Sequence, residues 1–311
     1  MLYIKKVFTL IAVLVVLTCL FYVGLNKLAS KESRPFNNRV TQKKTTPKKL
    51  TPPKVRLVAL GDSLTQGVGD TTQNGGYVYL IKQVLERRLN ATVTTKNYGK
   101  AGDRSDQIRE RLLQQEQMQQ DLKKANVITM TVGGNDLMQT LQKNFNSVSS
   151  DQLTTFMPTA QKTYTQKLTA LLKTVRSYNS DAPIFLYTVY NPFYVYFPAL
   201  TQMQKYTAQW NTLVSQTVAK DKKIYMVNVE RRLSEGQYYD HGSKLKQTTV
   251  TDYNNLSGEK LTQVLNNQKE KNNYLSATDH FHPNLKGYKY MAAKLYQVML
   301  KHKETWLKSG G

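Results

Sequence analysis

Short apolar runs recur along the chain, separated by stretches in which apolar residues follow helical spacing. Five runs rich in β-branched and aromatic residues predict strands: Val55–Leu60, Ala91–Tyr98, Val127–Val132, Ile184–Val189 and Ile224–Val229. Helices are predicted over 77–85, less regularly over 108–122, and over 152–179, 201–220, 258–270 and 285–302. This alternation predicts a parallel sheet with helices on both faces, and such sheets bind ligands at the carboxyl ends of their strands.

The N-terminus follows a different pattern. Two lysines in residues 1–6 precede Val7–Leu25, a run of nineteen residues without a charge. As a helix this run would be about 28 Å long, enough to span a bilayer core. Because Asn26–Ser30 is a poor cleavage site, an uncleaved anchor over residues 1–25 is favoured over a signal peptide. Secretion after cleavage is the alternative.

A basic, proline-containing stretch follows the predicted anchor. Residues 26–54 carry nine Lys or Arg, one acid and four prolines, which predicts a disordered linker. This positive charge alone would keep the following domain in the cytoplasm, but long domains translocate largely regardless of charge. We therefore expect a folded domain over residues 55–304 outside the cytoplasm, with a C-terminal tail over 305–311.

Charge narrows the choice of partners. The formal net charge is +23, and +13 of it lies on the 257 residues after position 54. Zinc-finger spacing, RNP-type aromatic motifs and helix-turn-helix signatures are all missing from the sequence, so nucleic acid is not the expected partner. The positive charge favours a membrane surface or an anionic cell-wall polymer, and a basic solvated surface without a specific partner is an equal alternative.

Four short segments carry the candidate chemistry. Ser63 follows the first predicted strand within Gly61–Leu64, where a glycine-flanked turn would expose a nucleophile. Gly102 and Asn135 follow the next strands along the chain and could supply a backbone N–H and a side-chain amide to an oxyanion. Asp279 and His282 lie three residues apart near the C-terminus, a spacing that suits a carboxylate orienting a histidine base.

These segments, in this order, resemble the blocks of the SGNH/GDSL hydrolases, a family of lipases and esterases, over roughly residues 55 to 300. The resemblance implies a three-layer α/β/α sandwich with a central five-stranded parallel sheet, of the flavodoxin-like type, here preceded by a transmembrane helix. It also implies that Ser63 is the nucleophile, His282 the base and Asp279 its orienting carboxylate. The oxyanion hole would comprise the Ser63 and Gly102 N–H groups and the Asn135 side chain.

Simpler interpretations compete at several positions. His280 is a second candidate base, but only His282 has a carboxylate three residues earlier and a proline directly after it. Asp62 and Asp136 lie beside the candidate site residues and are expected to hold turns through backbone hydrogen bonds. Because neither metal-ligand spacing nor a phosphate-loop motif is present, we predict no metal and no cofactor.

The substrate is the least determined part of the prediction. Four aromatic residues after the fourth strand form a candidate substrate pocket, although a purely structural cluster is equally expected: Tyr190, Phe193, Tyr194 and Tyr196. The predicted activity is hydrolysis of carboxylic esters by a lipase or esterase. An esterase for O-acetyl groups on wall polysaccharide is the first alternative, and a non-catalytic protein that binds a wall polymer is the second.

Overall fold

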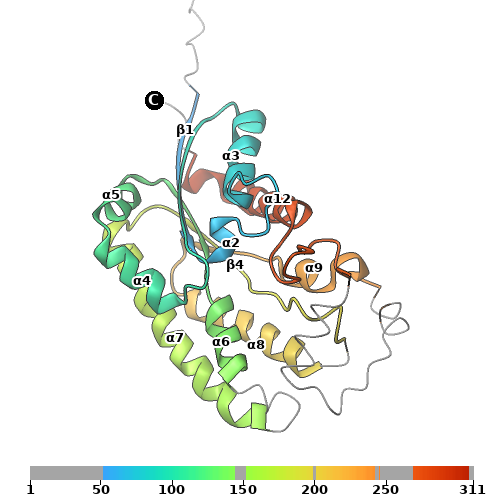
Figure 1. The fold of residues 1–311 in the computed structure, drawn as a ribbon. Coiled ribbons are helices and arrows are strands. Elements are labelled where there is room, and N and C mark those ends of the chain that lie inside the picture. The colour runs from blue at the N-terminus through green and yellow to red at the C-terminus, as the bar shows by residue number, and fades with distance from the viewer. Residues whose placement is uncertain (1–51, 144–151, 199–200, 242–244, 246–268, 308–311) are drawn as a thin grey trace, which may run out of the picture. The chain divides into compact units, whose positions relative to one another are not determined.

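The computed structural model describes residues 52–143, 152–198, 201–241, 245 and 269–307. The chain divides between Lys49 and Leu50, and everything described belongs to the second unit. Its centre is one five-stranded sheet in the order β2-β1-β3-β4-β5, with every neighbouring pair parallel. The strands are β1 (Lys54–Gly61), β2 (Thr92–Gly99), β3 (Val127–Thr131), β4 (Ile184–Tyr187) and β5 (Ile224–Val227). This confirms the predicted five-stranded parallel sheet, flanked by helices (Figure 1).

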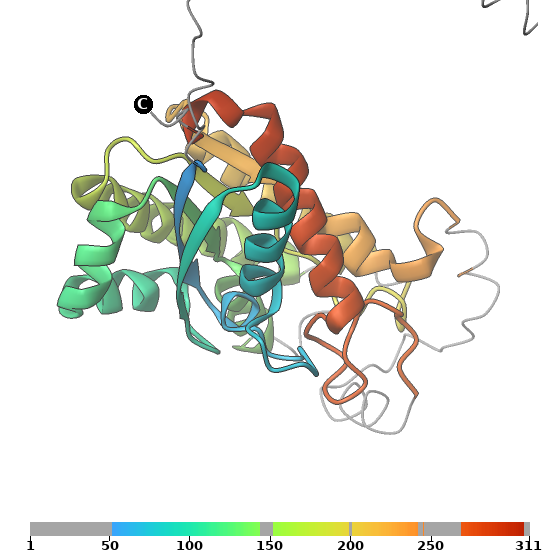
Figure 2. The ribbon, with the colours of Figure 1, turned by 90° about the horizontal axis from the view of Figure 1, so that it is seen from above.

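Helices cover both faces of the sheet. Besides short 3-10 turns, η2 (Gly236–Tyr238) and η4 (Lys303–Thr305), the described residues form these helices: α2 (Ser63–Gln66), α3 (Gly76–Leu89), α4 (Ser105–Gln114), α5 (Glu116–Lys124), α6 (Gly134–Lys143), α7 (Gln152–Tyr178), α8 (Thr201–Val218), α9 (Glu230–Glu235) and α12 (Leu285–Lys301). Figures 1 and 2 show α3 and α12 on one side of the sheet, and α4, α5 and α7 on the other.

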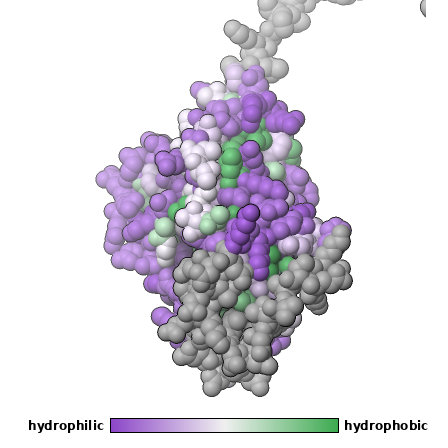
Figure 3. All heavy atoms as spheres, turned by 45° about the vertical axis from the view of Figure 1, so that its right-hand side comes forward, coloured by the Kyte–Doolittle hydropathy of each residue, from purple (hydrophilic) through white to green (hydrophobic). Residues whose placement is uncertain are grey.

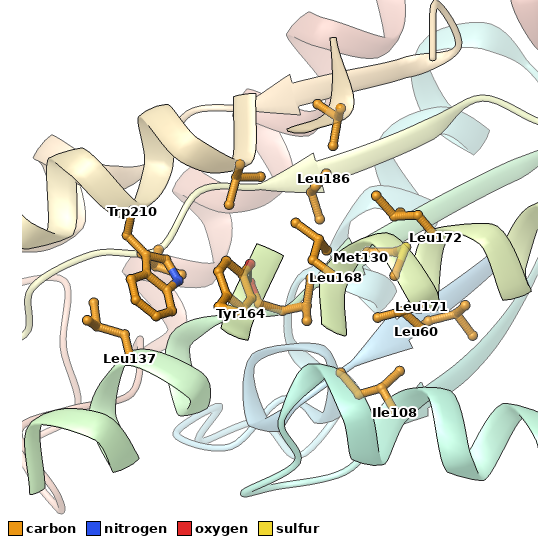
Figure 4. Close-up of a cluster of buried hydrophobic side chains, with 14 of the residues drawn as sticks. Leu60, Ile108, Met130, Leu137, Tyr164, Leu168, Leu171, Leu172, Leu186 and Trp210 are labelled. Carbon is orange, nitrogen blue, oxygen red and sulfur yellow. Dashed lines mark hydrogen bonds between the residues drawn. The ribbon is translucent and has the colours of Figure 1, made fainter. Parts of the chain in front are cut away.

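The core consists of two layers, which follow from the alternation of side chains along each strand. Leu60, Met130 and Leu186 point into the layer beneath α4, α7 and α8, to which Leu168 and Trp210 also belong (Figure 4). The intervening strand residues point the other way. Leu57, Phe185 and Tyr187 pack against α3 and α12. A strand buried on both faces reads as a continuous apolar run, which is why the runs were visible in the sequence.

The structure divides one predicted helix into two and adds others. The irregular pattern over 108–122 belongs to two helices, α4 and α5, because the backbone of Gln115 between them is extended (φ −103°, ψ 102°). Short α2 and α6 were not predicted. Apolar residues at positions 137, 138 and 141 give α6 one buried face, and this spacing was the signal that could have revealed it.

Several predicted segments lie outside the described residues: the anchor over 1–25, most of the linker over 26–54, and most of the helix expected over 258–270. Among the helices that are described, none is long and apolar enough to cross a membrane. Trp306 is buried, and its Nε1 donates to the Met299 carbonyl at 2.9 Å, so packing continues past residue 304.

Candidate active site

Ser63 lies at the turn from β1 to α2. Asp62 caps this short helix, because its carboxylate accepts the Leu64 N–H at 3.0 Å and the Thr131 hydroxyl at 2.7 Å. Gly61 leaves no space for a side chain, since an added Cβ would collide with Thr131 and Thr65. The β1–α2 turn is therefore packed and hydrogen-bonded against the end of β3. Ser63 lies at the carboxyl edge of the sheet with only 5% of its surface exposed.

A chain of hydrogen bonds joins Ser63 to the C-terminal segment. His282 Nε2 lies 2.9 Å from Ser63 Oγ, although the two residues are 219 positions apart. The other ring nitrogen, Nδ1, lies 2.7 Å from Asp279 Oδ2. Asp279 Oδ1 accepts the backbone N–H groups of Phe281 and His282, each at 3.0 Å. The structure thus brings the three predicted triad residues together in the order that the chemistry requires.

Electrostatics favour an ionised Asp279. Burial alone would raise the pKa of its carboxyl group, but hydrogen bonds from the His282 side chain and from the backbone N–H groups of His282 and Phe281 outweigh it and lower the pKa below its ordinary value. The anionic carboxylate can therefore hold a proton on His282 Nδ1, which leaves Nε2 free to accept one from Ser63.

The two remaining oxyanion candidates lie on neighbouring loops. Gly102 has φ +85°, and an added Cβ would contact nothing, so this backbone is open to a ligand. The Asn135 side-chain amide donates to the Asp103 carbonyl at 2.9 Å and lines the same pocket as Ser63. Gln139 adds a longer hydrogen bond of 3.4 Å to the Gly102 carbonyl. The loop that carries Gly102 is thereby tied to α6.

Arg111 supports this arrangement and was missed in the sequence. Its side chain is only 13% exposed and pairs with Asp103 through a 2.5 Å contact. It also donates to the carbonyl groups of Gly61 and Tyr98, both at 3.1 Å. One guanidinium therefore joins the ends of β1 and β2 to the Gly102 loop. The available signal was a charged residue on the apolar face of the α4 pattern, between Ile108 and Leu112.

An apolar pocket opens beside Ser63 and Asn135. Its volume is about 40 Å³, room for about three water-sized groups. Among the described residues its wall includes these apolar side chains: Leu137, Met138, Leu141, Val189, Met203 and Phe281. The pocket suits the apolar part of a small substrate, bound next to the candidate nucleophile.

The four aromatic residues of the predicted substrate pocket are divided by the structure. Tyr190 lines the pocket, and its hydroxyl donates to the Phe281 carbonyl at 2.7 Å. Phe193 is buried behind the wall, with its ring centre 6.2 Å from that of Phe281. Tyr196 is 1% exposed and contacts His280. Tyr194 is half-buried and, like Phe193 and Tyr196, is not part of the described pocket wall.

The other acidic and histidine residues hold loops. Asp136 accepts both the backbone N–H and the hydroxyl of Ser105, at 2.9 and 2.7 Å, and burial raises the pKa of its carboxyl group. His280 is buried and pairs with Glu270 at 2.6 Å. In the described part of the chain, no three His, Cys, Asp or Glu side chains are grouped so that they could hold a metal ion.

Asp62 should make stability depend on pH. Burial raises the pKa of its carboxyl group from 3.8 to about 6, against the opposing hydrogen bonds from Thr131 and Leu64. The folded state therefore binds more protons than the unfolded state between about pH 4 and 6, and stability falls as pH rises through this window. Asp62→Asn keeps the accepting oxygen but has no charge to bury. Between pH 4 and pH 7.5, the free energy of unfolding of the variant should rise by about 2–3 kcal/mol relative to that of wild type.

The measurement is urea unfolding of both proteins at each pH. The quantity compared is the difference in free energy of unfolding between variant and wild type, so titrations shared by both proteins cancel. A difference that stays constant across the range would mean that Asp62 ionises in the folded protein as it does in water.

Residues 59–290 match the model of the GDSL-like lipase/acylhydrolase family, and the chain belongs to this family. It is a carboxylic ester hydrolase. This family accounts for the four segments found in the sequence, and the fold agrees with it.

Individual proteins that resemble the chain share less than 30% of its residues. The chain is 28% identical to the uncharacterized protein YpmR of Bacillus subtilis over 79% of this chain and 81% of that protein. It is 29% identical to the spore germination lipase LipC of Bacillus licheniformis over 52% of this chain and 74% of the relative. Among solved structures, the lipase Lip_vut3 from a goat rumen metagenome superposes with a TM-score of 0.57 at 24% identity, covering 78% of this chain and 97% of that one. This last likeness concerns the fold.

Proposed function

We propose that this esterase works through a Ser63–His282–Asp279 triad on esters with a short acyl group. The observation that carries the proposal is the unbroken line of contacts from Asp279 Oδ2 to His282 Nδ1 and from His282 Nε2 to Ser63 Oγ, 2.7 and 2.9 Å long. It ends at the mouth of an apolar pocket. A serine hydroxyl is a weak nucleophile, and a histidine base at this distance provides the activation it needs.

The proposed reaction proceeds in two halves. Ser63 Oγ attacks the ester carbonyl carbon while His282 Nε2 takes its proton, and Asp279 stabilises the imidazolium that results. The tetrahedral intermediate collapses, its C–O bond to the alcohol breaks, and His282 gives the proton to the leaving alcohol. Water then attacks the acyl-Ser63 ester with His282 again as base, which releases the carboxylic acid and restores the serine.

Three donors are proposed to stabilise the negative oxygen of both intermediates: the N–H groups of Ser63 and Gly102 and the side-chain amide of Asn135. Asn135 Nδ2 has two hydrogens, and only one is needed for its bond to Asp103. The other is therefore available to the oxyanion. Such donors matter most when they are fixed before the reaction, which the ties of Asp103 to Arg111 support.

The pocket favours short acyl groups. A volume of about 40 Å³ suits two to four carbons, whereas a long fatty acyl chain would have to leave the pocket. This also supports the first alternative, an esterase for O-acetyl groups on carbohydrate, because an acetyl group would fit. A protein that only binds a wall polymer has no use for a complete set of contacts from Ser63 to Asp279.

A series of p-nitrophenyl esters from acetyl to palmitoyl tests the function, together with acetylated sugars. While each added methylene enters the pocket, kcat/KM should rise about fourfold per carbon. We expect a maximum at or before the butyryl ester and a fall of about tenfold or more by the octanoyl ester. The full chain is used, with every ester below its critical micelle concentration. A rate that keeps rising to palmitoyl would contradict the short-acyl proposal, and turnover of acetylated sugars above the simple esters would favour the carbohydrate alternative.

We further propose that the enzyme is tethered to the membrane and acts outside the cytoplasm, near anionic cell-wall polymers. The uncharged run Val7–Leu25 and the basic linker over 26–54 support this. The surface also suits an aqueous setting. Figure 3 shows a mainly hydrophilic face with small apolar areas, and only Leu113 and Leu300 are strongly exposed large apolar side chains among the described residues.

A further inference from the structure

His280 has a backbone and a side chain that the proposed reaction does not explain. It lies between Asp279 and His282 on the loop over residues 275–283, which an antiparallel bridge between Leu275 and Pro283 closes and which we call the triad loop. Its φ is +56°, in the left-handed region that costs free energy for a residue with a side chain. The side chain is 10% exposed, and its ring contacts Glu270, whereas the contact with Ser63 is made by His282. A strained histidine that is also buried indicates that its surroundings hold it there.

Two residues from other parts of the chain meet the imidazole. Glu270 Oε2 lies 2.6 Å from Nδ1, and the carboxylate is itself only 9% exposed. The Tyr196 hydroxyl lies 2.9 Å from the same nitrogen, with the two rings edge to face at 5.8 Å. Burial raises the pKa of Tyr196, with the nearby Glu270 carboxylate adding to the rise, so the hydroxyl stays protonated. With a proton on Nδ1, His280 donates to Glu270.

The partners of His280 are themselves anchored. Tyr196 accepts the Lys271 backbone N–H at 3.2 Å, and Glu270 Oε1 accepts the Asn272 N–H at 2.5 Å. Tyr196 also packs in the large core layer behind the pocket. The contact with His280 therefore joins the triad loop to the segment after β4 and to residues 270–272, at the point where these three parts of the chain meet.

Most other bonds of the triad loop are internal. Ser276 N donates to the His282 carbonyl at 2.8 Å, and His280 N donates to the Ser276 carbonyl at 2.9 Å. These bonds keep the loop in shape but do not connect it to Ser63, and the residues that lead into it are held separately, through the Asn272 bond to the Leu233 carbonyl at 2.8 Å. The outward contacts of residues 279–282 include the His282 bond to Ser63, the Tyr190 bond to the Phe281 carbonyl, the Phe281 ring beside Phe193, and the His280 contact.

We propose that His280 is a positioning residue: through Glu270 and Tyr196 it holds the triad loop at the place where His282 Nε2 meets Ser63 Oγ. This inference rests on the proposed triad. Attack by Ser63 depends on the alignment of the base, and a displacement of about 1 Å can lower a rate about a hundredfold. Loss of the His280 contact should therefore reduce kcat, because the loop samples more positions, while KM changes much less, because the pocket wall lies on other segments except for Phe281.

Two substitutions of His280 distinguish the effect of its side-chain contact from the effect of its backbone conformation. His280→Gly accepts a positive φ without strain but removes the donor. His280→Asn also tolerates this backbone, and its Nδ2 stands about where the imidazole Nδ1 stood. We expect the glycine variant to lose about tenfold or more in kcat with KM within about twofold, and the asparagine variant to stay within about threefold of wild type. Asn90→Gly is the matched control, since Asn90 has φ +48° at the end of α3.

Glu270→Gln and the double variant with His280→Gly complete the test. If the two side chains act as one unit, Glu270→Gln lowers kcat on its own but adds little in the glycine background. Thermal unfolding shows that each variant is folded at the assay temperature, and titration with a fluorophosphonate gives rates per competent Ser63. Wild-type kcat in His280→Gly, equal losses in the glycine and asparagine variants, or an effect on KM alone would overturn the proposal.

A failure of the proposed function would look different. In that case wild type itself would lack turnover that depends on Ser63, and both proposals would fall. If wild type is active through Ser63 and the glycine and asparagine variants still behave alike, the triad stands and the role of His280 is wrong.

Discussion

Replacing Ser63 by alanine should lower kcat for every ester by a factor of about 10⁴ or more, because no other group can form the acyl-enzyme. The folded state should hardly change. The hydroxyl has one described side-chain partner, His282 Nε2 at 2.9 Å, and the turn around it is held by Asp62, Thr131 and the backbone instead. Initial rates with p-nitrophenyl acetate and butyrate measure the loss, and thermal unfolding measures the stability.

Ser234→Ala is the matched control for a buried serine. Ser234 is fully buried, and its hydroxyl accepts the Asn191 N–H at 2.9 Å. Its loss should destabilise the fold by about 1–3 kcal/mol but leave turnover within a few-fold of wild type. Ser63→Ala should therefore lose activity and keep its stability, whereas Ser234→Ala should lose stability and keep its activity. Activity near wild type in Ser63→Ala would remove this residue from the mechanism.

The sheet could be predicted because its central strands are buried on both faces. Val55–Leu60 and Ile184–Val189 stand out as apolar runs, and β1 and β4 lie there. Prediction failed where local signals are short or mixed. The four residues of α2 are set by the Asp62 cap rather than by apolar spacing. A single extended residue, Gln115, divides α4 from α5.

The candidate site was predicted through its segments, since Ser63, Gly102 and Asn135 each follow a strand end and parallel strands bring these ends together, whereas Asp279 and His282 were recognised by their spacing. Distances such as Ser63 to His282, 219 residues apart, follow from the fold and cannot be counted along the chain. The supporting groups were harder to find. Arg111 had one signal, a charged residue on the apolar face of the α4 pattern, and Glu270 lies in a polar stretch where no local pattern distinguishes it. Tyr196 was singled out as an aromatic, but its hydroxyl contacts His280 and its ring is buried in the core.

Asp279→Asn should be nearly as damaging as loss of the nucleophile, with kcat reduced about 10⁴-fold. The asparagine oxygen can still accept the Phe281 and His282 N–H groups that Asp279 Oδ1 accepts at 3.0 Å, so the loop keeps its shape. The amide nitrogen would then face His282 Nδ1, where the carboxylate oxygen now lies at 2.7 Å. Two donors cannot share this contact. The imidazole must carry its proton on Nε2 instead, and it can no longer accept one from Ser63.

Comparison with Asp279→Ala separates two roles of Asp279, which are to set the tautomer of His282 and to hold the shape of the loop. Alanine removes both oxygens, so it should lower stability as well as kcat, whereas asparagine should lower kcat with a smaller loss of stability.

The negative charge of Asp279 also makes the stability difference between wild type and Asp279→Asn depend on pH. Because the pKa of Asp279 lies below its ordinary value of 3.8, the stability it contributes is complete above about pH 4 and is lost as pH falls through the folded-state pKa. The stability gap between wild type and Asp279→Asn should therefore narrow in acid. If kcat in this variant fell less than tenfold, Asp279 would not be the orienting group, and Asp62, whose carboxylate also interacts with His282, would become the candidate.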